Sequence, residues 1–190
     1  MRQYLVHGSG NKGDYESKLI YFPNWAEDTI SRGDSSYPIP TMPDGFKIIF
    51  AGNIGFSQDM ESITSTALEL KKYTDIKFIL IGDGRSKPFV ENFIVENNLQ
   101  QTVFLLGKFP IEAMNAFFTH ADGLLVSLKD ELIFNLTVLA KVQAYMSSSK
   151  PILGMMNGEG ALLIEEAGCG YSAPAGNHKN WPKLLCRFMI

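Results

Sequence analysis

The chain has 190 residues, 45% of them hydrophobic and 19% charged, which is enough to bury one sizeable core. Its 17 Lys and Arg residues against 20 Asp and Glu residues give a formal net charge of -3, so we expect no basic face for nucleic acid. Because the sequence has no CxxC pair, no signal-peptide pattern and no apolar run of roughly 18 residues, we expect a cytoplasmic protein without disulfides or a membrane span.

The first 45 residues are predicted to be an N-terminal segment and an inter-domain linker rather than core. Residues 1–18 are polar and glycine-rich, and residues 24–44 combine several prolines with Ser, Asp and Glu. Residues 19–22 (LIYF) are a short apolar run that could still form a strand.

The next part of the chain alternates between short apolar runs and segments with helical spacing. The apolar runs predict buried parallel strands at residues 46–51, 77–81, 102–106, 123–127, 151–154 and 170–173. The segments between them predict helices at residues 59–73, 86–97, 111–120, 137–148 and 160–167. Strict alternation with short links implies right-handed crossovers, and so a doubly wound, Rossmann-like α/β domain over residues 46–177.

Residues 178–190 are predicted to be a helical segment. Its apolar end, which includes Phe188, Met189 and Ile190, would normally pack on another part of a protein. We therefore expect this segment to be truncated and the chain to be a fragment of a larger protein.

The loop after the first predicted strand is a candidate ligand site, because ligands in open α/β sheets bind beyond the carboxyl ends of the strands. Gly52, Asn53 and Gly55 lie in this loop, and its glycines would let the backbone approach a phosphate. The third glycine of a dinucleotide fingerprint is absent, since Gln58 occupies its place. A tight turn that requires positive φ explains these glycines equally well.

The next two loops carry weaker signals. Gly82 begins a Gly-Asp-Gly turn, for which a purely structural role is the simpler interpretation, while Arg85 beside it could reach an anionic ligand. Phe109 lies in the loop at residues 107–110, whose free backbone groups could read the edge of a nucleobase, although a plain turn explains this loop equally well.

The connection at residues 131–151 is the richest in polar groups that could hold a sugar nucleotide, namely Glu131, Thr137, Lys141, Gln143 and Tyr145. Thr137, Lys141 and Tyr145 are spaced by four, so on one helix they would share a face. That face could serve a diphosphate through the lysine charge, the threonine hydroxyl and the partial positive charge of the helix start. A solvated lysine and a half-buried core tyrosine are the simpler interpretations of the same spacing.

A second candidate anion site precedes the last predicted helix. Gly158, Glu159, Gly160 and Ala161 lie there, and their backbone amides could meet an anion. An inward-facing Glu159 would repel a phosphate, so a sugar hydroxyl is the better partner for it. The sequence has no GxSxG, HExxH or other nucleophilic pattern, so an enzyme of this kind would work by positioning and charge stabilisation.

Over roughly residues 18–177 the chain resembles the C-terminal, nucleotide-binding domain of family 4 glycosyltransferases with the GT-B architecture. The resemblance is greatest to bacterial enzymes that transfer N-acetylated deoxy sugars in surface-polysaccharide assembly. It is carried by the pieces YFPNW (21–25), AGNIG (51–55) with Gln58, IGDG (81–84), AD (121–122), KVQAYM (141–146), KPI (150–152) and EEAGCG (165–170). Each piece is weak alone, whereas their order and spacing together are specific.

This resemblance implies the transfer of a sugar, with retained anomeric configuration, from a nucleoside diphosphate donor in polysaccharide or lipopolysaccharide synthesis. It implies a UDP-N-acetyl sugar as donor, catalytic roles for Glu131 and Lys141, a ribose contact for Gln143, and donor binding by the other loop residues named above. No cofactor and no metal are expected. The sugar or lipid-linked acceptor would bind to an N-terminal domain absent from this chain, and the full protein would associate with the inner face of the membrane.

Two departures from the family pattern bear on donor binding. The family places two glutamates eight apart, and here Leu136 and Ala144 occupy those places, so that Glu131 is only an approximate stand-in for the first. Residues 58–60 (QDM) replace the basic residues that usually follow the first strand. Either Lys141 and backbone amides bind the diphosphate, or donor binding is weaker than in the family.

Two other functions remain open at this point. The missing glutamate pair favours a non-catalytic, Rossmann-like nucleotide-binding module. A nucleotide-sugar epimerase related to the GT-B enzymes is the third reading. The polar face at Thr137, Lys141 and Tyr145 favours the glycosyltransferase.

Overall fold

The computed structural model describes residues 35–182 and residue 185. The possible strand at residues 19–22, the YFPNW piece and most of the predicted C-terminal segment lie outside the described residues. Within the described part of the chain, no helix is long and apolar enough to cross a membrane.

The core of the fold is one sheet of six parallel strands in the order β3-β2-β1-β4-β5-β6. The strands are β1 (Phe46–Ala51), β2 (Ile76–Ile81), β3 (Val103–Gly107), β4 (Gly123–Ser127), β5 (Ile152–Met155) and β6 (Gly170–Ala173). All six predicted strands are therefore confirmed to within one residue at each end, and with them the doubly wound α/β fold. The strand order reverses between β1 and β4, which is the place where such sheets bind ligands.

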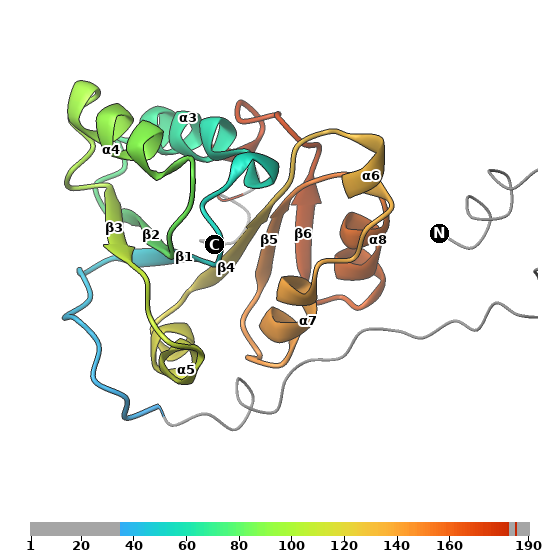
Figure 1. Cartoon of the computed structure of the whole chain (residues 1–190), viewed down its shortest axis with the longest axis horizontal. Helices are drawn as coiled ribbons and strands as arrows, with labels where there is room; N and C mark the ends of the chain where they lie inside the picture. Colours follow the sequence, from blue (N-terminus) through green and yellow to red (C-terminus); the bar gives the residue numbers. More distant parts are fainter. Residues whose placement is uncertain (1–34, 183–184, 186–190) are drawn as a thin grey trace, which may run out of the picture.

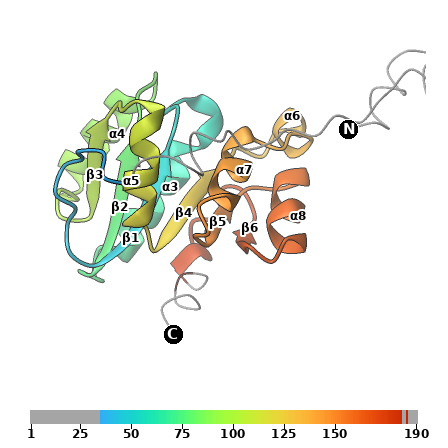
Figure 2. The same ribbon diagram turned by 90° about the horizontal axis from the view of Figure 1, so that it is seen from below.

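Helices cover both faces of the sheet. They are η2 (Phe56–Gln58), α3 (Met60–Leu70), α4 (Lys87–Glu96), η3 (Ile111–Ala113), α5 (Met114–Thr119), α6 (Leu132–Asn135), α7 (Ala140–Met146) and α8 (Glu159–Glu166). Figure 1 shows α3 and α4 above the sheet and α5 and α7 below it, and Figure 2 shows α5 in front of β1 and β2 with α3 behind them.

Each face of the sheet has its own apolar core because the side chains of a strand alternate between the two faces. In β1, Ile48 and Phe50 pack with α3 and α4, whereas Ile49 packs with α5 and α7 on the other face. Both strands that flank the reversal, β1 and β4, are almost completely buried, as expected for a parallel sheet covered on both sides. The carboxyl ends of the strands thus form a rigid edge on which the loops are mounted.

The part of the predicted linker that the structure describes, residues 35–45, contains neither helix nor strand. It does not stand away from the domain, since Tyr37, Ile39 and Met42 pack against the core on the α5 side.

The single helix predicted at residues 137–148 is wrong in its first turn. The structure has two shorter helices, α6 and α7, and Leu139 at the start of α7 is extended (φ -66°, ψ 135°). Thr137 lies between the two helices and its hydroxyl donates to the Ile133 carbonyl at 2.6 Å. The β-branched pair Thr137 and Val138 disfavours continuation of the helix here.

Candidate functional site

A pocket of about 710 Å³ opens at the carboxyl ends of β1 and β2, between the loop that follows β3 and the helices α5 and α7. Its wall is formed by Ala51, Gly52, Asn53, Ile81, Gly82, Lys108, Phe109, Ile111, Met114, Phe118, Ala140, Lys141, Ala144 and Tyr145. None of these residues is acidic. The pocket is of the size and mainly apolar character that small-molecule sites have in proteins.

The pocket exists because β1 and β4 separate before β1 ends. The two strands pair only at Ile48 with Gly123 and at Ile49 with Leu124. At Ala51 the hydroxyl of Tyr145 takes the place of the missing strand, since it accepts from the Ala51 N–H at 2.9 Å and donates to the Ala51 carbonyl at 3.3 Å. Burial raises the pKa of Tyr145 far above its ordinary value. Tyr145 therefore closes the floor of the pocket, and its hydroxyl is already engaged.

Lys141 is the cationic group at the reversal of the sheet. Its side chain starts from α7 and its ammonium donates to Oε1 of Gln58 at 2.7 Å, while Nζ lies 3.7 Å from the centre of the Phe50 ring. Burial lowers the pKa of Lys141 to about 7. A lysine whose pKa is lowered in this way, in a pocket where the strand order reverses, is typical of functional sites.

Glycines occupy the ends of β1 and β2, where the backbone has positive φ. Gly52 and Gly82 have φ of 143° and 141°, and a Cβ at Gly82 would lie 1.8 Å from the Gly52 carbonyl oxygen. A Cβ at Gly52 would come within 3.1 Å of the Lys141 Nζ. A tight turn with positive φ is thus enough to explain Gly82. At Gly52, the absence of a side chain also leaves room for Lys141.

One wall of the pocket is aromatic and apolar. Phe109 from the loop after β3 packs edge-on against Phe117, with ring centres 4.8 Å apart, and Phe118 packs edge-on against Tyr145 at 5.3 Å. Met114 and Ile111 complete this wall. Edge-to-face packing holds these rings in place, so the wall is preformed.

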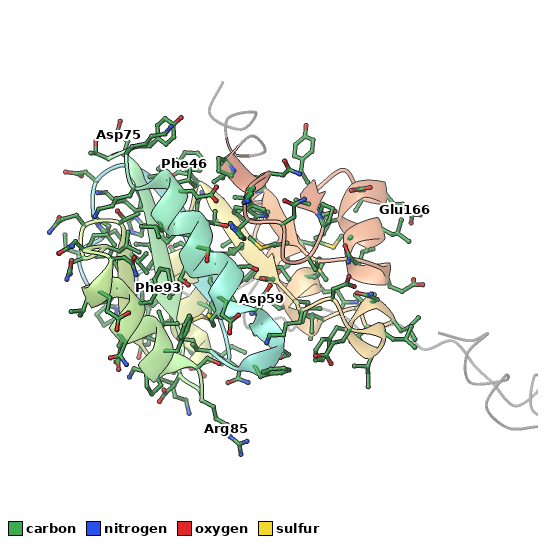
Figure 3. The ribbon with its side chains drawn as sticks, turned by 90° about the horizontal axis from the view of Figure 1, so that it is seen from above. Phe46, Asp59, Asp75, Arg85, Phe93 and Glu166 are labelled. Atoms are coloured by element: carbon green, nitrogen blue, oxygen red, sulfur yellow. The ribbon has the colours of Figure 1, made fainter. Side chains whose placement is uncertain are left out.

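Several residues of the predicted site lie near the pocket without lining it. Gly55 is buried beside the Asn53 side chain, Gln143 is half-buried on α7, and Arg85 is exposed. Figure 3 shows Arg85 projecting away from the body of the molecule.

Another group of predicted residues gathers at the carboxyl ends of β4 and β5. Glu131 is exposed at the start of α6, and Thr137 follows that helix. A Cβ at Gly158 would lie 1.9 Å from the Asn135 carbonyl oxygen, and the nearest backbone atom to Gly160 belongs to Thr137. Gly158 at the start of α8 is thus packed against the end of α6, and Gly160 against the Met156 side chain, which explains these two glycines. Glu159 is exposed and Ala161 is half-buried.

Neighbouring polar groups tie the same region together. The Asn135 side chain donates to Asp130 at 2.9 Å, and hydrogen bonds from Asn135 and Asn157 lower the pKa of Asp130. Asn157 also accepts from the Ala175 N–H at 3.2 Å. Apart from Gly55, Arg85 and Gln143, the predicted site residues therefore fall into two groups, one in the pocket at β1 and β2 and one at the ends of β4 and β5.

The sequence reasoning missed the residues that complete the pocket. Gln58 does not itself line the pocket, and the sequence marked it as part of the family resemblance and as an exception to two residue patterns. Its contact with Lys141 across the sheet edge was not predicted. Met114 and Phe118 are spaced by four on α5, which reads as ordinary core packing. Lys108 neighbours Phe109 and gave no signal of its own.

Among residues 35–182 and 185, no group of three or more His, Cys, Asp or Glu residues is arranged to hold a metal ion.

No protein-family model matches the chain. Two curated proteins align with part of it. WcaI of Escherichia coli, named as a colanic acid biosynthesis glycosyl transferase, is 27% identical over 119 residues, which cover 59% of this chain and 28% of WcaI. MJ1178 of Methanocaldococcus jannaschii, named as an uncharacterized glycosyltransferase, is 32% identical over 95 residues, which cover 50% of this chain and 25% of MJ1178. The matched part thus spans about a quarter of the length of these relatives.

Solved structures share the fold. The pneumococcal O-GlcNAc transferase GtfA, solved in complex with UDP and GlcNAc, superposes with a TM-score of 0.75 over 98% of this chain and 36% of GtfA, at 15% sequence identity. At that identity the likeness concerns the arrangement of the backbone and not the residues of the site.

Proposed function

Since the chain is similar in sequence to glycosyltransferases and has the fold of the C-terminal domain of GT-B glycosyltransferases, we propose that it binds the nucleotide-sugar donor of such an enzyme. The enzyme would transfer a sugar in the synthesis of a polysaccharide or lipopolysaccharide. The donor is proposed to be a UDP-N-acetyl sugar and the transfer to retain anomeric configuration. The name of WcaI supports the polysaccharide context.

The observation that carries this proposal is the position of Lys141. Its ammonium lies at the reversal of the sheet, beside a pocket whose lining includes no carboxylate. In a pocket with few polar groups an ammonium strongly favours an anion, because the low local dielectric strengthens the attraction. A diphosphate placed in the pocket next to Gly52 and Lys141 would meet both this charge and an exposed stretch of backbone.

The aromatic wall is proposed to take the nucleobase. Phe109, Met114 and Phe118 offer apolar surface at the end of the pocket that the loop after β3 borders. A base has two apolar faces and polar edges, so it can pack on such a wall while its edge meets backbone groups of residues 107–110. The GtfA complex with UDP supports uridine as the base, which stays a proposal for this chain.

The catalytic contribution of this domain would be stabilisation of the leaving diphosphate. As the bond to the sugar breaks, negative charge grows on the diphosphate, and a preorganised ammonium stabilises it more than it stabilises the intact donor. Glu131 and the residues at the start of α8 are proposed to border the donor sugar, since they follow β4 and β5 at the same edge of the sheet.

Binding to the isolated chain tests the proposal, because the matched part covers only a quarter or so of the relatives' length. Calorimetric titration with uridine, UMP and UDP should show affinity rising with the number of phosphates, and GDP and ADP should bind more weakly than UDP. Lys141→Met should lower the affinity for UDP by about tenfold or more and change the affinity for uridine by less than about twofold. This is the effect expected for loss of a charge-assisted hydrogen bond worth roughly 1.5 to 3 kcal/mol.

Arg85→Met is the matched control, because Arg85 is a cation on the neighbouring loop that does not line the pocket. It should leave UDP affinity within about twofold. Failure of the wild-type chain to bind any nucleotide would refute the proposal. Conversion of a UDP-sugar into its epimer by the chain would replace it with the epimerase function.

A further inference from the structure

We infer that Gln58 is a positioning residue for Lys141, holding its ammonium over the open end of β1 with one hydrogen bond and leaving its charge for the diphosphate. This inference rests on the proposed function and deepens it. It names a neutral side chain, on the opposite face of the sheet, that orients the ammonium of Lys141.

The two residues reach each other across the edge of the sheet. Lys141 belongs to α7, which packs on one face, and Gln58 ends η2, which leads into α3 on the other face. The side chain of Lys141 passes the end of β1 beside Gly52, and its Nζ meets Oε1 of Gln58 at 2.7 Å. The crossing is possible because β1 and β4 no longer pair beyond Ile49 and Leu124.

Gln58 is held in place before any ligand arrives. The residue is only 7% exposed, and Asp59, directly after it, has the left-handed φ of 45°, which turns the chain sharply into α3. The Ser57 carbonyl accepts from the Lys129 N–H at 3.0 Å, which ties η2 to the end of β4. A left-handed conformation in a residue other than glycine is costly and is kept where the surroundings require it.

The chemistry of an amide suits this task better than that of a carboxylate. An ammonium has three donors, and the Gln58 oxygen uses one of them without neutralising the charge. The titratable groups around Nζ add no opposing charge within the pocket, since Lys108 is basic and the Tyr145 hydroxyl is engaged with Ala51. Asp59 is the nearest acidic residue in sequence to Gln58, but it does not line the pocket. The ammonium is thus oriented while its charge stays uncompensated.

Two substitutions distinguish positioning from mere packing. Gln58→Met keeps the length and volume of the side chain and removes the acceptor, whereas Gln58→Glu keeps the acceptor and adds a negative charge. The readouts are the affinity for UDP-GlcNAc between pH 6 and pH 8 and, separately, the pH dependence of Lys141 acylation followed by mass spectrometry. UDP-GlcNAc is the suitable probe because it lacks the terminal phosphate that titrates near pH 6.

The wild-type affinity should fall about tenfold between pH 6 and pH 8, as the charged fraction of a lysine with a pKa about 7 falls. Gln58→Met should weaken binding about tenfold at pH 6, where the lysine is charged, because the ammonium is no longer held. Gln58→Glu should move the acylation midpoint to higher pH by about one unit or more and weaken binding at pH 6, because the new carboxylate competes with the diphosphate.

The outcomes separate the inference from the proposed function. If the wild-type chain binds no nucleotide, both fail. If it binds UDP-GlcNAc, and Gln58→Met and Gln58→Glu bind as the wild type does over the whole pH range, the positioning role alone is refuted. Should Gln58→Met not fold, the affinity and acylation profile of Gln58→Glu decide the matter by themselves.

Discussion

The Tyr145 hydroxyl holds both backbone polar groups of Ala51, the last residue of β1. In a parallel sheet these groups would pair with the neighbouring strand, but β4 has already parted from β1 at this point. A side chain from α7 thus substitutes for a strand and lets the sheet open into a pocket without leaving a buried N–H unpaired.

Tyr145→Phe should therefore destabilise the domain although it removes a single oxygen atom. Loss of the hydroxyl leaves the buried Ala51 N–H without its acceptor, which costs about 1 to 3 kcal/mol in the free energy of unfolding. Urea denaturation measures this difference. Tyr73→Phe is the control, since Tyr73 is 44% exposed and should change stability by less than about 0.5 kcal/mol. Equal effects of the two substitutions would contradict the role given to Tyr145.

The fold could be predicted from the sequence because each strand is a short apolar run closed by a turn. Apolar runs such as residues 46–51 and 123–127 predict buried parallel strands once helices alternate with them. The order of the strands, and with it the reversal between β1 and β4, was not predicted, because the rule for right-handed crossovers fixes the hand of each connection and not which strands are neighbours.

The pocket could be predicted only in part. Gly52, Lys141 and Phe109 were found because they follow strands or stand out chemically. Gln58 was noted for its place after the first strand, but its contact with Lys141 could not be found, because the two residues are 83 positions apart. The break at Thr137 was also hidden, since a spacing of four between Thr137, Lys141 and Tyr145 predicts a continuous helix when tertiary packing is unknown.

Gly82→Ala should strongly destabilise the domain. A Cβ at this position would lie 1.8 Å from the Gly52 carbonyl oxygen, so the first two loops would have to separate. We expect a loss of about 3 kcal/mol or more in the free energy of unfolding, as for other severe steric conflicts in packed regions. Gly168→Ala is the matched control: Gly168 also has positive φ (60°), but a Cβ there meets no atom within 4 Å. It should cost about 1 kcal/mol, the strain of a left-handed conformation alone.

Lys141→Met should stabilise the domain, and the gain should depend on pH. The folded-state pKa of Lys141 is lowered to about 7 from 10.5, so above pH 7 the unfolded chain binds more protons at this residue than the folded one. Wild-type stability therefore rises with pH in this window, by up to about 1.4 kcal/mol per unit, and the burial penalty is fully present below pH 7. The advantage of Lys141→Met should be largest below pH 7 and shrink as pH rises towards 10. Chemical denaturation of both proteins at pH 6, 8 and 9 measures it, and a difference that stays constant over this range would show that the lysine is not buried as described.

Phe109→Ser should lower the affinity for uridine and the affinity for UDP to the same extent. If the aromatic wall takes the base, its contribution is common to both ligands, and losing a stacking or edge contact costs roughly 1 to 3 kcal/mol, or about fivefold or more in affinity. Lys141→Met, by contrast, acts on the phosphates alone. Phe56→Ser is the control, because Phe56 is 65% exposed and does not line the pocket. A Phe109→Ser variant that loses affinity for UDP but keeps it for uridine would place the base elsewhere, and the pocket between α5 and α7 would then have to hold the sugar or the diphosphate instead.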